Sequence, residues 1–328
     1  MRRLEPCAVV RVSFVDFWPG FDPHAFLIPL LCAAPFHFEV QVVKGGKANI
    51  EFHSVFSSSA KRFVEGVGRR TRRLATGRTA ANLGRVGEST SEAIRIWLTG
   101  ENIRPPSHGW DATLSFDPDS QIARNAYFPL WWQMFPELIG GEQPARPGIA
   151  KVSKFLPLDT FLMDRDGAAG QRKKFACAII SNPESTRMCA IRALQELGPV
   201  DVFGRVTGQP ISDKFEVFRD YQFAVCFESD TYPGYVTEKL FDAWGAGCIP
   251  LWWGLDRGSH LNSNAFVNLA ETTGVDGFIA EVERLHRDSD ARNEMSSLRV
   301  LSQRPTLDSV RSLLAHVLLG FRPSGDLA

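Results

Sequence analysis

The chain has 328 residues, of which 44% are hydrophobic, 11% aromatic and 23% charged. This ordinary globular composition excludes a disordered, collagen-like or disulfide-dense protein, and the length predicts two domains. Lysine plus arginine and aspartate plus glutamate both number 37, so the formal charge is zero. The overall attraction to a polyanion that marks nucleic-acid-binding proteins is therefore absent, and no nucleic-acid partner is expected.

The six cysteines are scattered along the chain without a Cys-x-x-Cys pair. This distribution favours reduced thiols in a cytoplasmic protein over a zinc site or a disulfide framework. The longest apolar run, residues 25–36, is interrupted by Pro29 and Pro35 and is far shorter than the about 20 residues that span a bilayer. We therefore expect a soluble, cytoplasmic protein.

The first half of the chain alternates between strand-like runs and loops, which indicates an α/β layer. The last of these runs leads into Thr99-Gly100-Glu101-Asn102. Glu101 is therefore expected just beyond the carboxyl end of a strand, where an open α/β sheet presents its functional groups. Strands are predicted at residues 9–15, 38–43, 50–56 and 94–98.

Residues 61–87 carry the strongest charge patch, with eight Lys or Arg residues and one Glu. One interpretation is a solvated loop or helix face. The other is docking to anionic lipid, which stabilises by about 1 kcal/mol per basic residue near the surface. On that second interpretation, Lys61 to Arg85 is a candidate for peripheral contact with the inner membrane.

A stretch rich in Gly, Pro and Ala, within residues 140–172, predicts the linker between two domains, 1–150 and 151–328. Beyond it, the pattern is that of strands connected by helices, as in βαβ units. One helix is expected to begin near Arg187, and another is expected over Thr237 to Trp244. The strands are predicted at residues 175–180, 200–203, 221–227 and 248–253.

Both predicted helix starts carry a cation, Arg187 in one and Lys239 in the other. Cations are slightly disfavoured at this end of the helix dipole, whereas an anion is favoured there. One interpretation is that the two cations clamp a diphosphate. The other is that each is a tolerated surface residue.

Residues 227–240 read FESDTYPGYVTEKL, and residues 246–254 read AGCIPLWWG. This long motif resembles the donor-binding signature of the α1,3/α1,4-fucosyltransferases, glycosyltransferase family 10. The resemblance extends over residues 8–290, most densely over 175–270. It implies an α/β fold of the GT-B type, with two Rossmann-like domains facing across a cleft. GDP-fucose would bind in the C-terminal domain, which also holds the C-terminal helices, and the acceptor in the N-terminal domain.

The resemblance also implies an inverting transfer of fucose from this nucleotide-sugar donor to an oligosaccharide or glycolipid containing GlcNAc or Glc, in α1,3 or α1,4 linkage. In such a displacement a base deprotonates the acceptor hydroxyl while the sugar gains oxocarbenium character. By motif position Glu101 matches the family's general base and Glu238 its donor-contacting glutamate, so both are candidate catalytic residues. No metal or further cofactor is expected.

The same resemblance assigns the diphosphate-binding cations to Arg187 and Lys239. Tyr235 matches a residue that lines the donor site, although a core aromatic is the alternative interpretation. The remaining candidates for donor binding belong to the signature or to its upstream extension: Lys214, Glu228 and Ser229.

The sequence departs from the family pattern at Ser229-Asp230, where the family usually has Asn followed by Ser or Thr. A serine still donates and accepts hydrogen bonds, but it is shorter than an amide. Two alternatives therefore stay open: a transferase of the same fold that uses another nucleotide sugar, and a catalytically silent nucleotide-sugar-binding module. Three Asp-x-Asp triplets, at 117–119, 164–166 and 288–290, are expected to lie in loops rather than at metals.

Several tryptophans have two interpretations. Trp18, Trp131 and Trp132 could stack on the faces of acceptor sugars, or they could be buried in the core.

Overall fold

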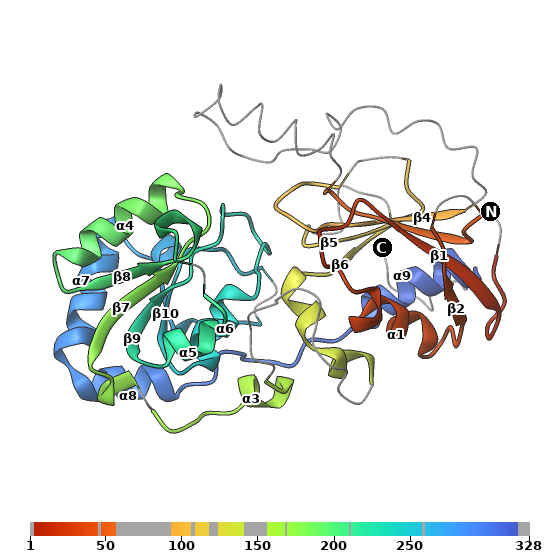
Figure 1. Ribbon diagram of the computed structural model, residues 1–328. Coiled ribbons are helices and arrows are strands. Elements are labelled where there is room, and N and C mark those ends of the chain that lie inside the picture. The colour runs from red at the N-terminus through yellow and green to blue at the C-terminus, as the bar shows by residue number, and fades with distance from the viewer. Residues whose placement is uncertain are drawn as a thin grey trace. The chain divides into compact units, whose positions relative to one another are not determined.

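The computed structural model describes residues 3–44, 47–56, 93–105, 109–117, 124–140, 156–167, 169–209, 211–257 and 260–320. The chain divides into two compact units, each built on its own sheet (Figure 1). Unit 1 comprises Met1–Ile149 and Thr306–Ala328, and unit 2 comprises Ala150–Pro305. The basic segment 61–87 and about half of the predicted linker, residues 141–155 and 168, lie outside the described residues.

Unit 1 contains a parallel six-stranded sheet in the order β2-β1-β3-β4-β5-β6. Because all the strands run in the same direction, the loops that follow β1, β3 and β4 leave from one edge of the sheet. The four strands expected in this part of the chain are present, with ends shifted by up to three residues. The strands are β1 (Val9–Val15), β2 (Glu39–Val42), β3 (Ile50–His53), β4 (Ile94–Leu98), β5 (Ala112–Ser115) and β6 (Asn125–Tyr127).

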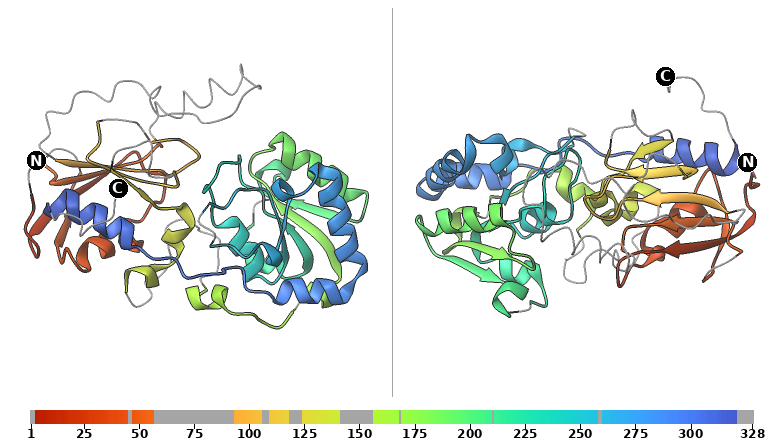
Figure 2. Two further views of the ribbon diagram at one scale, coloured as in Figure 1. Left: turned by 180° about the vertical axis from the view of Figure 1, so that it is seen from behind. Right: turned by 90° about the horizontal axis from the view of Figure 1, so that it is seen from above.

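Among the described residues of unit 1, α1 (Leu27–Cys32) packs next to β2, and α9 (Asp308–Leu319) packs against β5 and β6. Figure 2 shows α9, in blue, beside the unit 1 strands in both views. The C-terminal helices were expected in the second domain, and α9 departs from that prediction. Its residues Leu314 and Leu318 are fully buried, so the apolar face of α9 belongs to the core of unit 1.

Trp131 and Trp132 lie in a 3₁₀ turn, Leu130–Met134, and are 0% and 3% exposed. Their rings pack edge to face on each other and on neighbouring phenylalanines. Of their two interpretations, burial in the core is the one that the structure bears out.

Unit 2 contains a parallel five-stranded sheet in the order β11-β10-β9-β7-β8. Every residue of β9 and β10 is buried, which is expected of central strands covered on both faces. The strands are β7 (Lys174–Ile179), β8 (Val200–Phe203), β9 (Tyr221–Val225), β10 (Ile249–Trp252) and β11 (Val267–Asn268).

Helices cover both faces of this sheet: α4 and α7 lie on one side, α5 and α6 on the other (Figure 1). Buried residues of α4 and α7, such as Ile191 and Phe278, form one core cluster with strand residues such as Phe223. The helices are α3 (Leu158–Leu162), α4 (Ser185–Gln195), α5 (Lys214–Phe218), α6 (Lys239–Gly245), α7 (Gly274–Arg287) and α8 (Ser289–Ser297).

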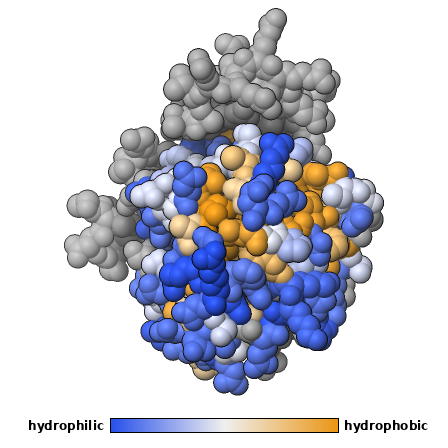
Figure 3. Space-filling view, turned by 90° about the vertical axis from the view of Figure 1, so that its left-hand side faces the viewer, coloured by the Kyte–Doolittle hydropathy of each residue, from blue (hydrophilic) through white to orange (hydrophobic). Residues whose placement is uncertain are grey.

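The surface seen in Figure 3 carries an apolar patch bordered by hydrophilic residues. Among the described residues, no helix combines the length and the hydropathy needed to cross a membrane.

Candidate functional site

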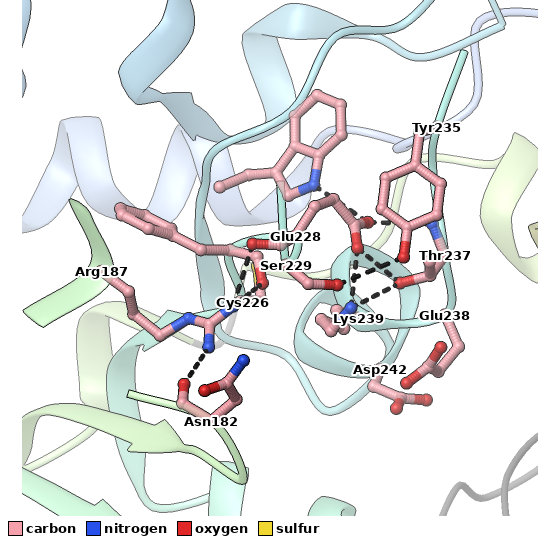
Figure 4. Close-up of polar contacts among 12 residues, drawn as sticks. Asn182, Arg187, Cys226, Glu228, Ser229, Tyr235, Thr237, Glu238, Lys239 and Asp242 are labelled. Carbon is pink, nitrogen blue, oxygen red and sulfur yellow. Dashed lines mark hydrogen bonds and ion pairs between the residues drawn. The ribbon is translucent and has the colours of Figure 1, made fainter. Parts of the chain in front are cut away.

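The carboxylate of Glu228 organises the loop between β9 and α6. Its side chain is fully buried and accepts two hydrogen bonds from Thr237, from the backbone N–H at 2.9 Å and from the hydroxyl at 2.7 Å. The ammonium of Lys239 lies 2.8 Å from the same carboxylate. A buried carboxylate is stable only when hydrogen bonds and an opposite charge compensate for its lost hydration. Because Thr237 and Lys239 supply both, Glu228 fixes the loop to the start of α6 (Figure 4).

This arrangement changes where α6 begins. The sequence predicted a helix start at Thr237, where the helix dipole would favour an anion. The structure starts α6 at Lys239, and the N–H of Thr237 is already bonded to Glu228. Lys239 is therefore held by a carboxylate, while its side chain remains 30% exposed.

Arg187 reaches the same loop from α4. The first turn of α4 is capped by Glu184, whose side chain accepts two backbone N–H groups. The Arg187 guanidinium donates to the carbonyls of Asn182 at 2.8 Å, Phe227 at 3.0 Å and Glu228 at 2.9 Å. Arg187 and Lys239 thus meet on one residue, because Arg187 holds the backbone of Glu228 and Lys239 holds its side chain (Figure 4).

A second ion-pair group adjoins the first. Lys214, the first residue of α5, places its ammonium 3.2 Å from Glu238 and 2.7 Å from Asp242. Burial by itself raises the pKa of Glu238, but Lys214 and Lys239 outweigh it and hold that pKa well below its usual range. Glu238 is therefore ionised at neutral pH and suited to accept hydrogen bonds rather than to donate a proton.

Ser229 and Tyr235 face each other across the loop. The Ser229 hydroxyl lies 3.2 Å from the Tyr235 hydroxyl. Ser229 is exposed, whereas Tyr235 is 2% exposed. Tyr235 is thus largely a core residue that presents its hydroxyl to the loop.

The site combines equal numbers of positive and negative side chains in one part of unit 2. Asp242 was not among the candidates predicted from the sequence, and the signal that could have found it is its i, i+4 spacing from Glu238 on a helix. The six groups are Arg187, Lys214 and Lys239 with Glu228, Glu238 and Asp242.

Glu101 belongs to unit 1. It is exposed and follows β4, as the sequence predicted. Further along its loop, Arg104 forms a buried ion pair with Asp117 at 2.7 Å and donates to the side chain of Asn102, also at 2.7 Å. This ion pair anchors the loop that carries Glu101 to the end of β5.

Among the described residues, no group of three or more His, Cys, Asp or Glu side chains is arranged to hold a metal ion.

Comparison with known proteins identifies the segment that contains the unit 2 site. Residues 169–299 match the family model described as glycosyltransferase family 10 (fucosyltransferase) C-term. In this segment the chain is similar to the fucosyltransferases of glycosyltransferase family 10. All the unit 2 candidate residues lie within the matched segment, on or beside the loop from Glu228 to Lys239.

Two curated relatives are similar to this chain. The α-(1,3)-fucosyltransferase FucT of Helicobacter pylori is 27% identical over 225 residues, covering 63% of this chain and 47% of that protein. The α-(1,3)-fucosyltransferase 4 of Bos taurus is 26% identical over 212 residues, covering 59% and 47%. The match therefore spans about half the length of these relatives.

The fold is shared with a solved α1,3-fucosyltransferase, with a TM-score of 0.65 at 18% identity over 97% of this chain and 92% of that one. A structure of α1,3-fucosyltransferase with GDP-fucose gives a TM-score of 0.60 at 20% identity, over 94% and 86%. The prediction of an α/β fold of the GT-B type is confirmed.

Proposed function

We propose that this protein is a family 10 glycosyltransferase that transfers fucose from GDP-fucose to a hydroxyl of a saccharide that contains GlcNAc or Glc. The observation that carries the proposal is the convergence of Arg187 and Lys239 on Glu228, within the segment that matches the family. The names of the relatives support the transfer of fucose, and one solved neighbour of the same fold is described with GDP-fucose.

The donor diphosphate would bind at the exposed side of Lys239. Glu228 holds the ammonium from the protein interior, so the lysine is fixed in place before an anion arrives. Arg187 keeps the backbone of this loop in the same arrangement. Preorganised cations of this kind stabilise the charge that grows on a leaving GDP without further rearrangement.

In the proposed reaction the acceptor oxygen attacks the anomeric carbon of fucose from the face opposite the diphosphate. The new C–O bond forms as the bond to phosphate breaks, and GDP leaves with the electron pair. Glu101 takes the proton of the acceptor hydroxyl, a role that contributes about 10²–10⁴-fold. Glu238, which is ionised, would accept hydrogen bonds from hydroxyls of the donor.

A transfer assay tests this proposal. Purified protein is incubated with GDP-fucose and 4-galactosyl-N-acetylglucosamine or lactose, and the product is detected by mass spectrometry. We expect fucosylated product from the wild type, and a loss of about 10²-fold or more in kcat for Glu101→Gln. Glu39→Gln, on an exposed position of β2, is the control. A Glu101→Gln variant with normal kcat would refute its role as base.

A second candidate function is transfer from another nucleotide sugar. It is favoured by one observation, that the residue standing in place of the family's Asn is the exposed Ser229, bonded to Tyr235. Repeating the assay with GDP-mannose and UDP-GlcNAc distinguishes the two candidate functions. Product from one of these donors but not from GDP-fucose would favour transfer from another nucleotide sugar.

A further inference from the structure

Aromatic rings are concentrated at the carboxyl edge of the unit 1 sheet. Phe17 stacks on Phe21 with ring centroids 4.1 Å apart, and Trp18 contacts both rings. Phe56, in the loop after β3, packs edge to face on Trp18 at 5.6 Å. Each of these four rings is partly exposed, so the group, here called the aromatic platform, is open to solvent.

The platform lies above the core rather than within it. Phe14 of β1 connects the two, because its ring lies 5.6 Å from Phe21 and is stacked at 5.6 Å on Phe52. Phe52 is completely buried. Of the platform rings, Phe56 also packs against the small buried cluster of Val55 and Trp97. The core of unit 1 already has Phe52 below Phe14, so the exposed faces of the platform add apolar surface beyond what the core requires.

Backbone hydrogen bonds join the loops that carry the platform. The N–H of Phe56 donates to the carbonyl of Asp16 at 2.7 Å, and the N–H of Ser54 donates to the carbonyl of Val15 at 3.0 Å. Asp16 adopts a left-handed backbone conformation, with φ of 58°. The turn after β1 is thereby fixed, and the rings of the platform are preorganised.

The loop that carries Glu101 lies against this platform. A Cβ atom added to Gly100 would come within 2.6 Å of the Ser54 hydroxyl, 2.9 Å of the Phe56 ring and 3.3 Å of the Trp18 ring. Only a glycine fits here without displacing its neighbours. The peptide directly before Glu101 thus touches two rings of the platform.

Polar groups accompany the rings. Asp16 follows directly on β1, and burial raises its pKa while nearby His53 opposes the shift. The Ser54 hydroxyl is buried and has no hydrogen-bond partner among the described residues. A partly exposed aromatic face bordered by carboxylates and a hydroxyl suits a sugar ring, whose C–H face is apolar and whose rim carries hydroxyls.

We propose that Phe17, Trp18 and Phe56 form a stacking surface for a pyranose ring of the acceptor, beside Glu101. This inference rests on the proposed function and adds to it the part of unit 1 that selects the acceptor. A ring stacked here would have its hydroxyl rim next to the loop after β4.

The test compares the KM for 4-galactosyl-N-acetylglucosamine with the affinity for GDP-fucose. Trp18→Ala and Phe56→Ala are expected to raise the acceptor KM about tenfold, with the GDP-fucose affinity unchanged. Trp18→Phe, which keeps an aromatic face, should restore most of the loss. The matched control is Phe203→Leu, which removes a similarly half-buried ring from the edge strand β8 of unit 2.

A second measurement keeps the inference separate from the proposed function. Saturation-transfer NMR detects whether protons of the saccharide contact the protein, and it requires no turnover. If the wild type transfers no fucose, the proposed function fails, but a saccharide signal present in the wild type and lost in Trp18→Ala would still support the platform. An unchanged acceptor KM, or an unchanged NMR signal in Trp18→Ala, would overturn it. Equal losses of donor and acceptor binding would also overturn it, because they indicate a merely structural role.

Discussion

The ammonium of Lys239 lies 2.8 Å from a Glu228 carboxylate that is completely buried. In sequence both residues belong to one donor-binding signature, but in the structure their positions differ. Glu228 faces the interior, and Lys239 extends from it toward solvent. The Glu228 carboxylate thus holds the Lys239 ammonium in place, and the ammonium is the group available to an anionic ligand.

The first prediction concerns Glu228 as the support of the loop. Glu228→Gln removes the charge that pairs with Lys239, and its amide cannot accept all the hydrogen bonds now made. We expect a loss of about 1–3 kcal/mol in the free energy of unfolding, measured by urea denaturation. Glu216→Gln, at an exposed surface ion pair, should change it by less than about 0.5 kcal/mol. Equal losses in the two variants would show that Glu228 does not stabilise the loop.

The second prediction concerns pH. The folded-state pKa of Glu238 lies below its unfolded value of about 4.3, because Lys214 and Lys239 outweigh the burial of its carboxyl. The unfolded chain therefore binds more protons in acid, so this contribution to stability is present above about pH 4.3 and is lost as the pH falls through the folded-state pKa.

Lys214→Met removes the cation between Glu238 and Asp242. It should lower the free energy of unfolding by about 3–5 kcal/mol at pH 7. The difference from the wild type should shrink as the pH is lowered toward 3, because Glu238 of the variant is no longer held ionised by Lys214 and becomes neutral at a higher pH than in the wild type. Unfolding curves at several pH values measure this. Lys174→Met, at an exposed pair with Asp220, should show little effect at any pH. A Lys214→Met penalty that did not vary with pH would contradict the assignment.

The third prediction concerns the loop of Glu101. Asp117→Asn leaves the buried Arg104 guanidinium without the carboxylate 2.7 Å away, so unit 1 should lose about 3–5 kcal/mol of stability. Because the loop is then less well anchored, kcat should fall more than the affinity for GDP-fucose. Glu281→Gln, at an exposed pair with Arg284, is the control. A variant with normal stability would contradict the anchoring role of this ion pair.

Much of the fold was predictable because local patterns determine it. The strand-like runs over residues 94–98 and 200–203 coincide with β4 and β8, since β-branched and aromatic residues favour strands. The helix α9 was assigned to the wrong unit for a physical reason. The spacing of apolar residues along a helix predicts that one face is buried, but it does not predict which of two sheets covers that face.

The site was predictable as a set of residues but not as an arrangement. The motif identified Glu228 and Lys239 together, yet only the folded chain separates the buried partner from the exposed one. Asp242 was missed because its i, i+4 spacing from Glu238 gains a meaning only when a cation lies between the two carboxylates. Its role depends on Lys214, which is 28 residues away in sequence.

The most direct test of the central claim is calorimetric titration of the protein with GDP-fucose, GDP, GDP-mannose and UDP-GlcNAc, repeated with Lys239→Ala. We expect the wild type and Lys174→Ala to bind GDP and GDP-fucose, and Lys239→Ala to bind them at least about tenfold more weakly. Lys239→Arg, which keeps the charge, should bind better than the alanine variant. No binding of any nucleotide by the wild type, or undiminished binding by Lys239→Ala, would contradict the role of Lys239 in binding the donor diphosphate.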